Sequence, residues 1–95
     1  MFDLKNKTVF VAGGAGYLCV PSCLGLAQHG ANLIVADINI QAVERQVADL
    51  RKAVPESKVE GVVLDIADES SIQNAIHYAV DKLGKLDVLI NATYF

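Results

Sequence analysis

The sequence predicts a single α/β domain with a parallel sheet of four strands and three helices. Short runs of apolar and β-branched residues alternate with longer segments that are apolar on only one side of a helix. Glycine or proline stands where each helical segment should end. The chain has 95 residues, of which 53% are hydrophobic, 20% are charged and two are proline, so residues 1–95 fit one small folded domain.

The first strand is predicted over residues 7–13 (KTVFVAG), a buried apolar run. A helix follows over residues 18–29 and ends at Gly30, a typical C-terminal cap. Its inner face comprises Cys19, Cys23, Leu26 and Ala27. The two cysteines are expected to be small buried thiols, because a redox or metal pair would need a Cys-x-x-Cys spacing or further ligands nearby.

The second strand is predicted over residues 31–37 (ANLIVAD). The next helix has Asn39 as its N-cap and Pro55 as its stop. Its apolar stripe comprises Ile40, Val43, Val47, Leu50 and Val54.

The third strand is predicted over residues 58–65 (KVEGVVLD). In the helix that follows, Ser70 and Gln73 have the spacing of a capping box, and Gly84 closes the helix. Its apolar face comprises Ile72, Ala75, Ile76, Ala79, Val80 and Leu83.

The fourth strand is predicted over residues 86–92 (LDVLINA). Right-handed crossovers make the sheet parallel, and a fourth strand beside the first gives the order 3-2-1-4 with helices on both faces. This arrangement is a three-layer α/β/α sheet of the Rossmann type, truncated after its fourth strand. The bare edge of that strand predicts self-association or marginal stability of the isolated chain.

The stretch after the first strand is typical of a phosphate-binding turn. Gly13 and Gly16 allow a tight turn and a close approach of the backbone to a pyrophosphate, whereas Cys19 replaces the third glycine of such turns. Asp37 lies 21 residues after Gly16, where a carboxylate binds the ribose 2′-hydroxyl. Because that carboxylate would repel a 2′-phosphate, we expect NAD to be preferred over NADP.

Four segments in order resemble the short-chain dehydrogenase/reductase family: DLKNKTVFVAGGAGYL, VADI, LDIAD and KLGKLDVLINA. The resemblance covers essentially the whole chain. It implies the cofactor-binding N-terminal part of an NAD-dependent enzyme that transfers hydride between nicotinamide and an alcohol or carbonyl substrate. The cofactor-binding residues that it implies are Gly13, Gly16, Tyr17, Leu18, Asp37, Ile38, Asp65, Ile66, Asn91 and Ala92.

Within that set, the resemblance implies that Asp65 accepts a hydrogen bond from the adenine amino group. No catalytic residue is predicted. Tyr78 and Lys82 have the family's Tyr-x-x-x-Lys spacing, but they precede the fourth strand, whereas the family's pair follows the fifth. We expect them to be an ordinary surface pair one helical turn apart. The catalytic Ser, Tyr and Lys are therefore expected only in a longer parent enzyme.

Two alternatives stay open. A non-catalytic nucleotide-binding or interaction module is favoured by Ala12, Cys19 and the pair Thr93-Tyr94, which depart from the family's pattern. Half of an extended-branch epimerase or dehydratase is favoured by the spacing of the glycines in GGAGYL.

The composition also excludes several classes of function. A net charge of −3 without a basic cluster argues against nucleic acid or an anionic membrane as the main partner. No apolar run is long enough for a membrane span, and no secretory leader is recognisable, so a cytoplasmic protein is predicted. No metal site is expected.

Overall fold

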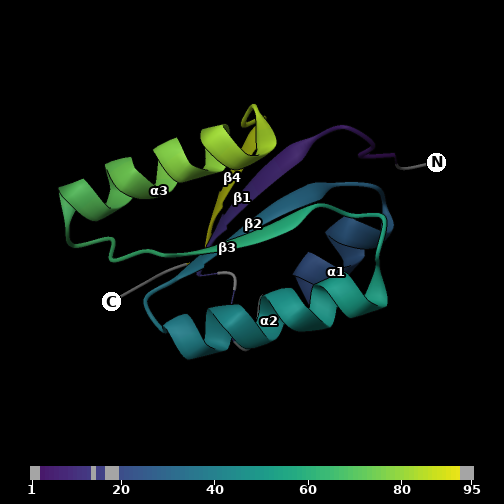
Figure 1. Cartoon of the computed structure of the whole chain (residues 1–95), viewed down its shortest axis with the longest axis horizontal. Coiled ribbons are helices and arrows are strands. Elements are labelled where there is room, and N and C mark those ends of the chain that lie inside the picture. Colours follow the sequence, from purple (N-terminus) through teal and green to yellow (C-terminus); the bar gives the residue numbers. More distant parts are fainter. Residues whose placement is uncertain (1–2, 14, 17–19, 93–95) are drawn as a thin grey trace.

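The computed structural model describes residues 3–13, 15–16 and 20–92 (Figure 1). All strand pairs are parallel, and the order of the sheet is β3-β2-β1-β4. Helix α3 covers one face of the sheet, and α1 and α2 cover the other (Figure 1). The predicted three-layer fold with strand order 3-2-1-4 is thus confirmed. The elements are β1 (Thr8–Ala12), α1 (Val20–Gln28), β2 (Asn32–Asp37), α2 (Ile40–Ala53), β3 (Val59–Val63), α3 (Glu69–Leu83) and β4 (Val88–Asn91).

The two central strands, β1 and β2, are buried on both faces. Side chains alternate between the faces of a strand, so the sheet contributes to two separate cores. The core beneath α1 and α2 includes Val9, Val11, Cys23, Leu33, Val35, Val43, Val47 and Leu50. The core beneath α3 includes Phe10, Ala12, Ile34, Ala36, Leu64, Ala75 and Ala79. The continuous apolar runs of β1 and β2 follow directly from this burial on both sides.

The N-terminus of α2 and the C-terminus of α3 match the prediction. The side-chain oxygen of Asn39 accepts a hydrogen bond from the backbone N–H of Ala42 at 3.1 Å, which satisfies one of the unpaired donors of the first turn. Gly84 ends α3 with a φ of 80° and donates its N–H to the carbonyl of Val80.

The predicted capping box of α3 is wrong. Asp68, rather than Ser70, is the N-cap, and its side chain accepts from the N–H groups of Ser70 and Ser71. A carboxylate is favoured here over a hydroxyl because the N-terminus of a helix carries a partial positive charge.

Two residues of the predicted apolar stripes are more exposed than expected. Ile40 is 43% exposed, because it is the first residue of α2 and lies at the edge of the sheet. Val80 is 44% exposed. The helical period places it on the flank of α3 opposite Tyr78, toward the β4 side, where no second helix of the described chain covers the sheet.

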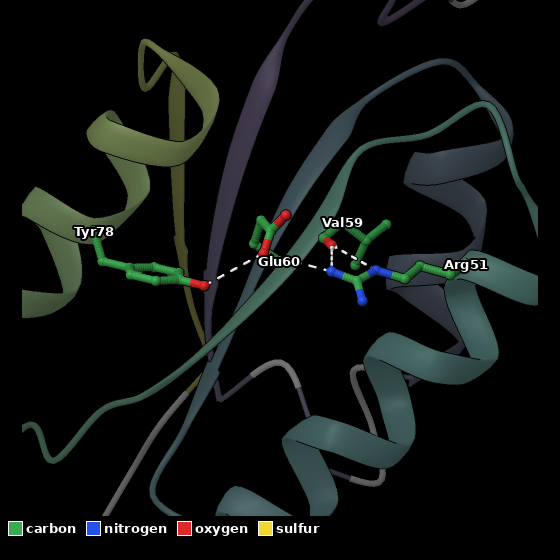
Figure 2. A network of polar contacts seen from close by, with 4 residues as sticks. All are labelled: Arg51, Val59, Glu60 and Tyr78. Atoms are coloured by element: carbon green, nitrogen blue, oxygen red, sulfur yellow. Dashed lines mark hydrogen bonds and ion pairs between the residues drawn. The ribbon is translucent and has the colours of Figure 1, made fainter.

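The outer edge of β3 is closed by side chains from both helical layers (Figure 2). The Arg51 guanidinium of α2 donates two hydrogen bonds, of 3.0 and 2.7 Å, to the Val59 carbonyl. Its Nη2 atom also lies 3.4 Å from Oε1 of Glu60. From the other face, the Tyr78 hydroxyl of α3 donates to the same Glu60 oxygen at 3.3 Å. These contacts connect α2, β3 and α3 around the edge strand.

The opposite edge, β4, is fixed to β1 at its start by Asp87. The N–H of Thr8 donates to Oδ2 of Asp87 at 2.9 Å, and the N–H of Asp87 donates to the Thr8 carbonyl at 3.0 Å. Nζ of Lys85 lies 3.3 Å from the same carboxylate oxygen. The hydrogen bond from Thr8 is the main reason that the pKa of Asp87 lies below its usual value of 3.8, and Lys85 lowers this pKa further.

We expect Gly61→Ala to destabilise the fold by about 1–3 kcal/mol, measured by urea unfolding. A Cβ atom at this position of β3 would lie 2.5 Å from Cγ1 of Val43 and 2.9 Å from Cγ2 of Val47. Both valines belong to α2 and have little rotamer freedom in a helix, so the helix itself would have to move. Gly25→Ala is the matched control, because a Cβ there meets nothing within 4 Å. Unchanged stability of Gly61→Ala would contradict this tight packing.

We expect Asp87→Asn to destabilise the fold at neutral pH, with a difference from the wild type that shrinks in acid. Because the folded-state pKa of Asp87 is lowered, its stabilisation is complete above the ordinary value of 3.8 and disappears as the pH falls through the folded value. Urea unfolding across this pH range measures the difference, with the exposed Asp49→Asn as control. A difference that stays constant in acid would rule out the assigned role.

Candidate functional site

The carboxyl ends of β1, β2 and β4 meet at one edge of the sheet. The register pairs Ala12 of β1 with Ala36 of β2 and with Asn91 of β4. The N–H of Gly13 donates to the Ala36 carbonyl at 2.7 Å, and the N–H of Ala92 donates to the Ala12 carbonyl at 2.9 Å. Gly13, which follows β1, is therefore hydrogen-bonded to β2 on one side. On the other side, the end of β1 is hydrogen-bonded to the residue that follows β4.

The turn after β1 is built from main chain. Gly13 has a φ of 80°, which side chains disfavour, and its carbonyl accepts the N–H of Gly16 at 3.0 Å. A Cβ on Gly16 would lie only 3.1 Å from that carbonyl oxygen. Both positions thus suit glycine, and the turn presents backbone rather than side chain to a ligand. The predicted cofactor residues Tyr17 and Leu18, and also Cys19, lie outside the described residues.

Asp37 is the last residue of β2, next to this turn. Its carbonyl accepts the N–H of Leu64 at 2.9 Å, which fixes its backbone against the end of β3. Its Oδ1 atom accepts the N–H of Asn39 at 3.3 Å, so the carboxylate is oriented by the start of α2. The following residue, Ile38, is 66% exposed and offers an apolar surface beside the carboxylate.

The segment after β3 forms a compact turn around Asp65. The Oδ1 atom of Asp65 accepts the N–H of Ala67 at 3.0 Å, and its carbonyl accepts the N–H of Asp68 at 3.1 Å. Its own N–H donates to Oγ of Ser71 at 2.9 Å. Ser71 was not among the predicted site residues. The spacing of Asp65, Asp68 and Ser71 was the available clue, because short polar side chains before a helix commonly accept backbone N–H groups.

An apolar cleft of about 310 Å³ lies beside this turn on the α3 face of the sheet. Two predicted site residues, Ile66 and Asn91, line it. The other residues of its wall are Phe10, Ala12, Leu64, Ile72, Ile76 and Leu89. The structure therefore brings Gly13, Gly16, Asp37, Asp65, Ile66, Asn91 and Ala92 to one edge, with an apolar surface next to them.

Tyr78 and Lys82 lie away from this edge. The Tyr78 side chain points toward β3, where its hydroxyl contacts Glu60 (Figure 2). Nζ of Lys82 is 5.7 Å from the centre of the Tyr78 ring. Burial raises the pKa of Tyr78, and the negative charge of Glu60 raises it further. A tyrosine that acts as a proton acceptor needs the opposite shift. Tyr78 is half-buried and Lys82 is exposed, and the two side chains contact each other one helical turn apart, as predicted.

Two features are absent from the residues that the structure describes. Among them, no group of three or more His, Cys, Asp or Glu side chains is arranged to hold a metal ion. No described helix is both long and apolar enough to cross a membrane. The cytoplasmic location stays a prediction from the sequence.

A parallel sheet with a glycine turn after its first strand and a carboxylate at the end of its second is typical of Rossmann-type dinucleotide-binding domains. The family model for short chain dehydrogenases matches residues 7–93. The chain belongs to the short-chain dehydrogenase/reductase family, as its sequence motifs predicted.

Known relatives agree with this assignment. The chain is 27% identical over 89 residues to YuxG, an uncharacterized oxidoreductase of Bacillus subtilis. The matched region covers 94% of this chain and 13% of YuxG. It is 28% identical to short-chain dehydrogenase reductase 3b of Arabidopsis thaliana, over 93% of this chain and 33% of that protein. Across eight curated relatives, the chain spans between 13% and 35% of their length.

Solved structures show the same fold. A short chain dehydrogenase from Mycobacterium smegmatis superimposes with a TM-score of 0.92 at 26% identity, over all of this chain and 40% of that one. An NAD+-bound xylitol dehydrogenase superimposes with a TM-score of 0.88 at 27% identity, over 96% of this chain and 35% of that one.

Proposed function

We propose that this chain binds NAD(H) along the carboxyl edge of its sheet, as the cofactor-binding part of a short-chain oxidoreductase. The observation that supports this most strongly is the direct connection between the glycine turn and the end of β2. Gly13 is bonded to the residue before Asp37, so a backbone suited to phosphates lies beside a carboxylate suited to a ribose.

The described residues fit the parts of a dinucleotide. Gly13 with its positive φ and Gly16 with its close contact to the Gly13 carbonyl allow a tight turn, as a pyrophosphate requires. The Asp37 carboxylate accepts hydrogen bonds from ribose hydroxyls, and its charge disfavours a 2′-phosphate. Asp65 and Ile66 would flank the adenine, one as a hydrogen-bond acceptor and one as an apolar contact. Asn91 and Ala92 would line the cofactor at the end of β4.

When bound, the nicotinamide supplies or accepts the hydride, and the substrate would be an alcohol or a carbonyl compound. The residues of this chain bind and orient the cofactor. We assign no proton transfer to Tyr78 and Lys82, because their position beside β3 is remote from the edge where the site lies. The substrate and the catalytic residues are proposed for the whole enzyme only, because this chain spans only part of the length of its relatives.

Asp37→Ala is expected to weaken the binding of NADH about tenfold or more, since hydrogen bonds to a charged group contribute roughly 1.5–3 kcal/mol. Calorimetric titration of the wild type should show a preference for NADH over NADPH, and the variant should lose most of this preference. The exposed Asp49→Ala is the control, because Asp49 lies on α2 outside the candidate site. Equal affinity of the wild type for the two cofactors would refute the role of Asp37, and no binding of either would favour an interaction module instead.

We also propose that the isolated chain associates with a second copy through β4. This edge strand exposes Val88 by 43%, Leu89 by 60% and Ile90 by 36%, and its outward backbone groups have no neighbouring strand in the described chain. Open edges of this kind pair with other strands. The β3 edge is less available, because Arg51 already occupies the Val59 carbonyl.

Light scattering after size-exclusion chromatography is expected to give a mass above the 10.2 kDa of one chain. Leu89→Lys should shift the equilibrium toward the monomer, because a charge on an edge strand opposes pairing. Val63→Lys is the matched control, since Val63 is 43% exposed at the end of the other edge strand. A heat-stable wild-type monomer would contradict the proposal.

A further inference from the structure

The position of Asp65 is held by a group outside the sheet. The last backbone hydrogen bond from the β3 side to β2 is the one from the Leu64 N–H to the Asp37 carbonyl. The next N–H, that of Asp65, faces away from β2 and donates to Oγ of Ser71, at 2.9 Å and partly buried. Ser71 thus supplies the hydrogen-bond partner on the side of Asp65 that no strand of the described chain covers.

Ser71 is itself held in place. It lies in the first turn of α3, and its N–H is 3.4 Å from Oδ1 of the helix cap Asp68. The N–H of Asp68 donates to the Asp65 carbonyl at 3.1 Å, which closes the turn on its other side. The hydroxyl of Ser71 therefore links a helix that is packed in the core to the backbone of the turn at Asp65.

The orientation of this turn determines what it offers to a ligand. The carboxylate of Asp65 only accepts hydrogen bonds, and Ile66 lines the apolar cleft together with Ile72 of α3. An acceptor beside an apolar wall suits a flat aromatic group with an exocyclic amino donor. Adenine has these features, whereas the corresponding deamino base, hypoxanthine, presents an acceptor at the same atom.

We infer that Ser71 is a positioning residue that sets the affinity for the adenine end of the cofactor by holding the backbone of Asp65. This inference rests on the proposed dinucleotide function. In this role Ser71 acts through the backbone of Asp65, whose N–H its Oγ atom accepts, and not through a contact of its own with the cofactor. The effect of Ser71 should appear as a difference in affinity between a cofactor whose purine donates a hydrogen bond to Asp65 and a cofactor whose purine does not.

The test compares the binding of NADH and of deamino-NADH to the whole chain, by calorimetry. Wild-type protein is expected to prefer NADH, and Ser71→Ala should weaken NADH about fivefold while changing deamino-NADH by less than about twofold, as the loss of one neutral hydrogen bond predicts. Ser71→Thr retains the hydroxyl and should restore most of the preference. Ser70→Ala is the matched control, because Ser70 is the exposed neighbour in the same turn.

The outcomes separate this inference from the proposed function. If wild-type protein binds NADH and Ser71→Ala binds it equally well, the inference is wrong and the proposed function stands. If Ser71→Ala weakens both ligands equally, together with a lower melting temperature, the hydroxyl is only structural and the inference is also overturned. If wild-type protein binds neither ligand, the proposed function is wrong and the inference that rests on it is overturned as well.

Discussion

The burial of β1 and β2 on both faces is the constraint on which the other features of this structure depend. Side chains of β2 such as Leu33 and Ile34 point to opposite faces, and both are fully buried. A strand of this kind needs a helical layer on each side, and helical crossovers make its neighbours parallel. Parallel strands end at a common edge. The glycine turn, Asp37 and the turn at Asp65 are therefore neighbours because of the core, before any ligand is considered.

The two edges of the sheet differ, and the difference has a physical origin. At β3, helices lie close on both faces, so Arg51 and Tyr78 reach Glu60 from opposite sides, and Arg51 also occupies the outward carbonyl of Val59. At β4, no helix of the described chain places a side chain against the outer edge, and the strand is exposed along its length. The edge at β3 is thus closed by side chains, whereas the edge at β4 is apolar and has no further strand beside it in the described chain.

Features that depend on nearby residues could be predicted from the sequence. The seven elements, the strand order and the cap at Asn39 follow from periodicity, from right-handed crossovers and from a polar side chain that bonds within three residues. The capping of α3 could not be decided in this way, because Asp68 and Ser70 are both good caps and only the geometry of the turn selects between them. The contact of Tyr78 with Glu60 spans 18 residues and depends on how α3 lies across the sheet. Sequence patterns do not specify that angle.

The site residues divide along the same line. Gly13, Gly16 and Asp37 are recognisable because each position favours a particular residue type. The two turn positions suit a residue without a Cβ atom, and the end of β2 suits a carboxylate. Ser71 is different, since many residues are tolerated in the first turn of a helix and only the structure shows that its hydroxyl accepts the N–H of Asp65. Residues that support a site through the backbone of another residue leave little trace in a single sequence. They become visible once hydrogen-bond partners are assigned, because the bond between Asp65 and Ser71 joins the end of a strand to a helix six residues later in the chain.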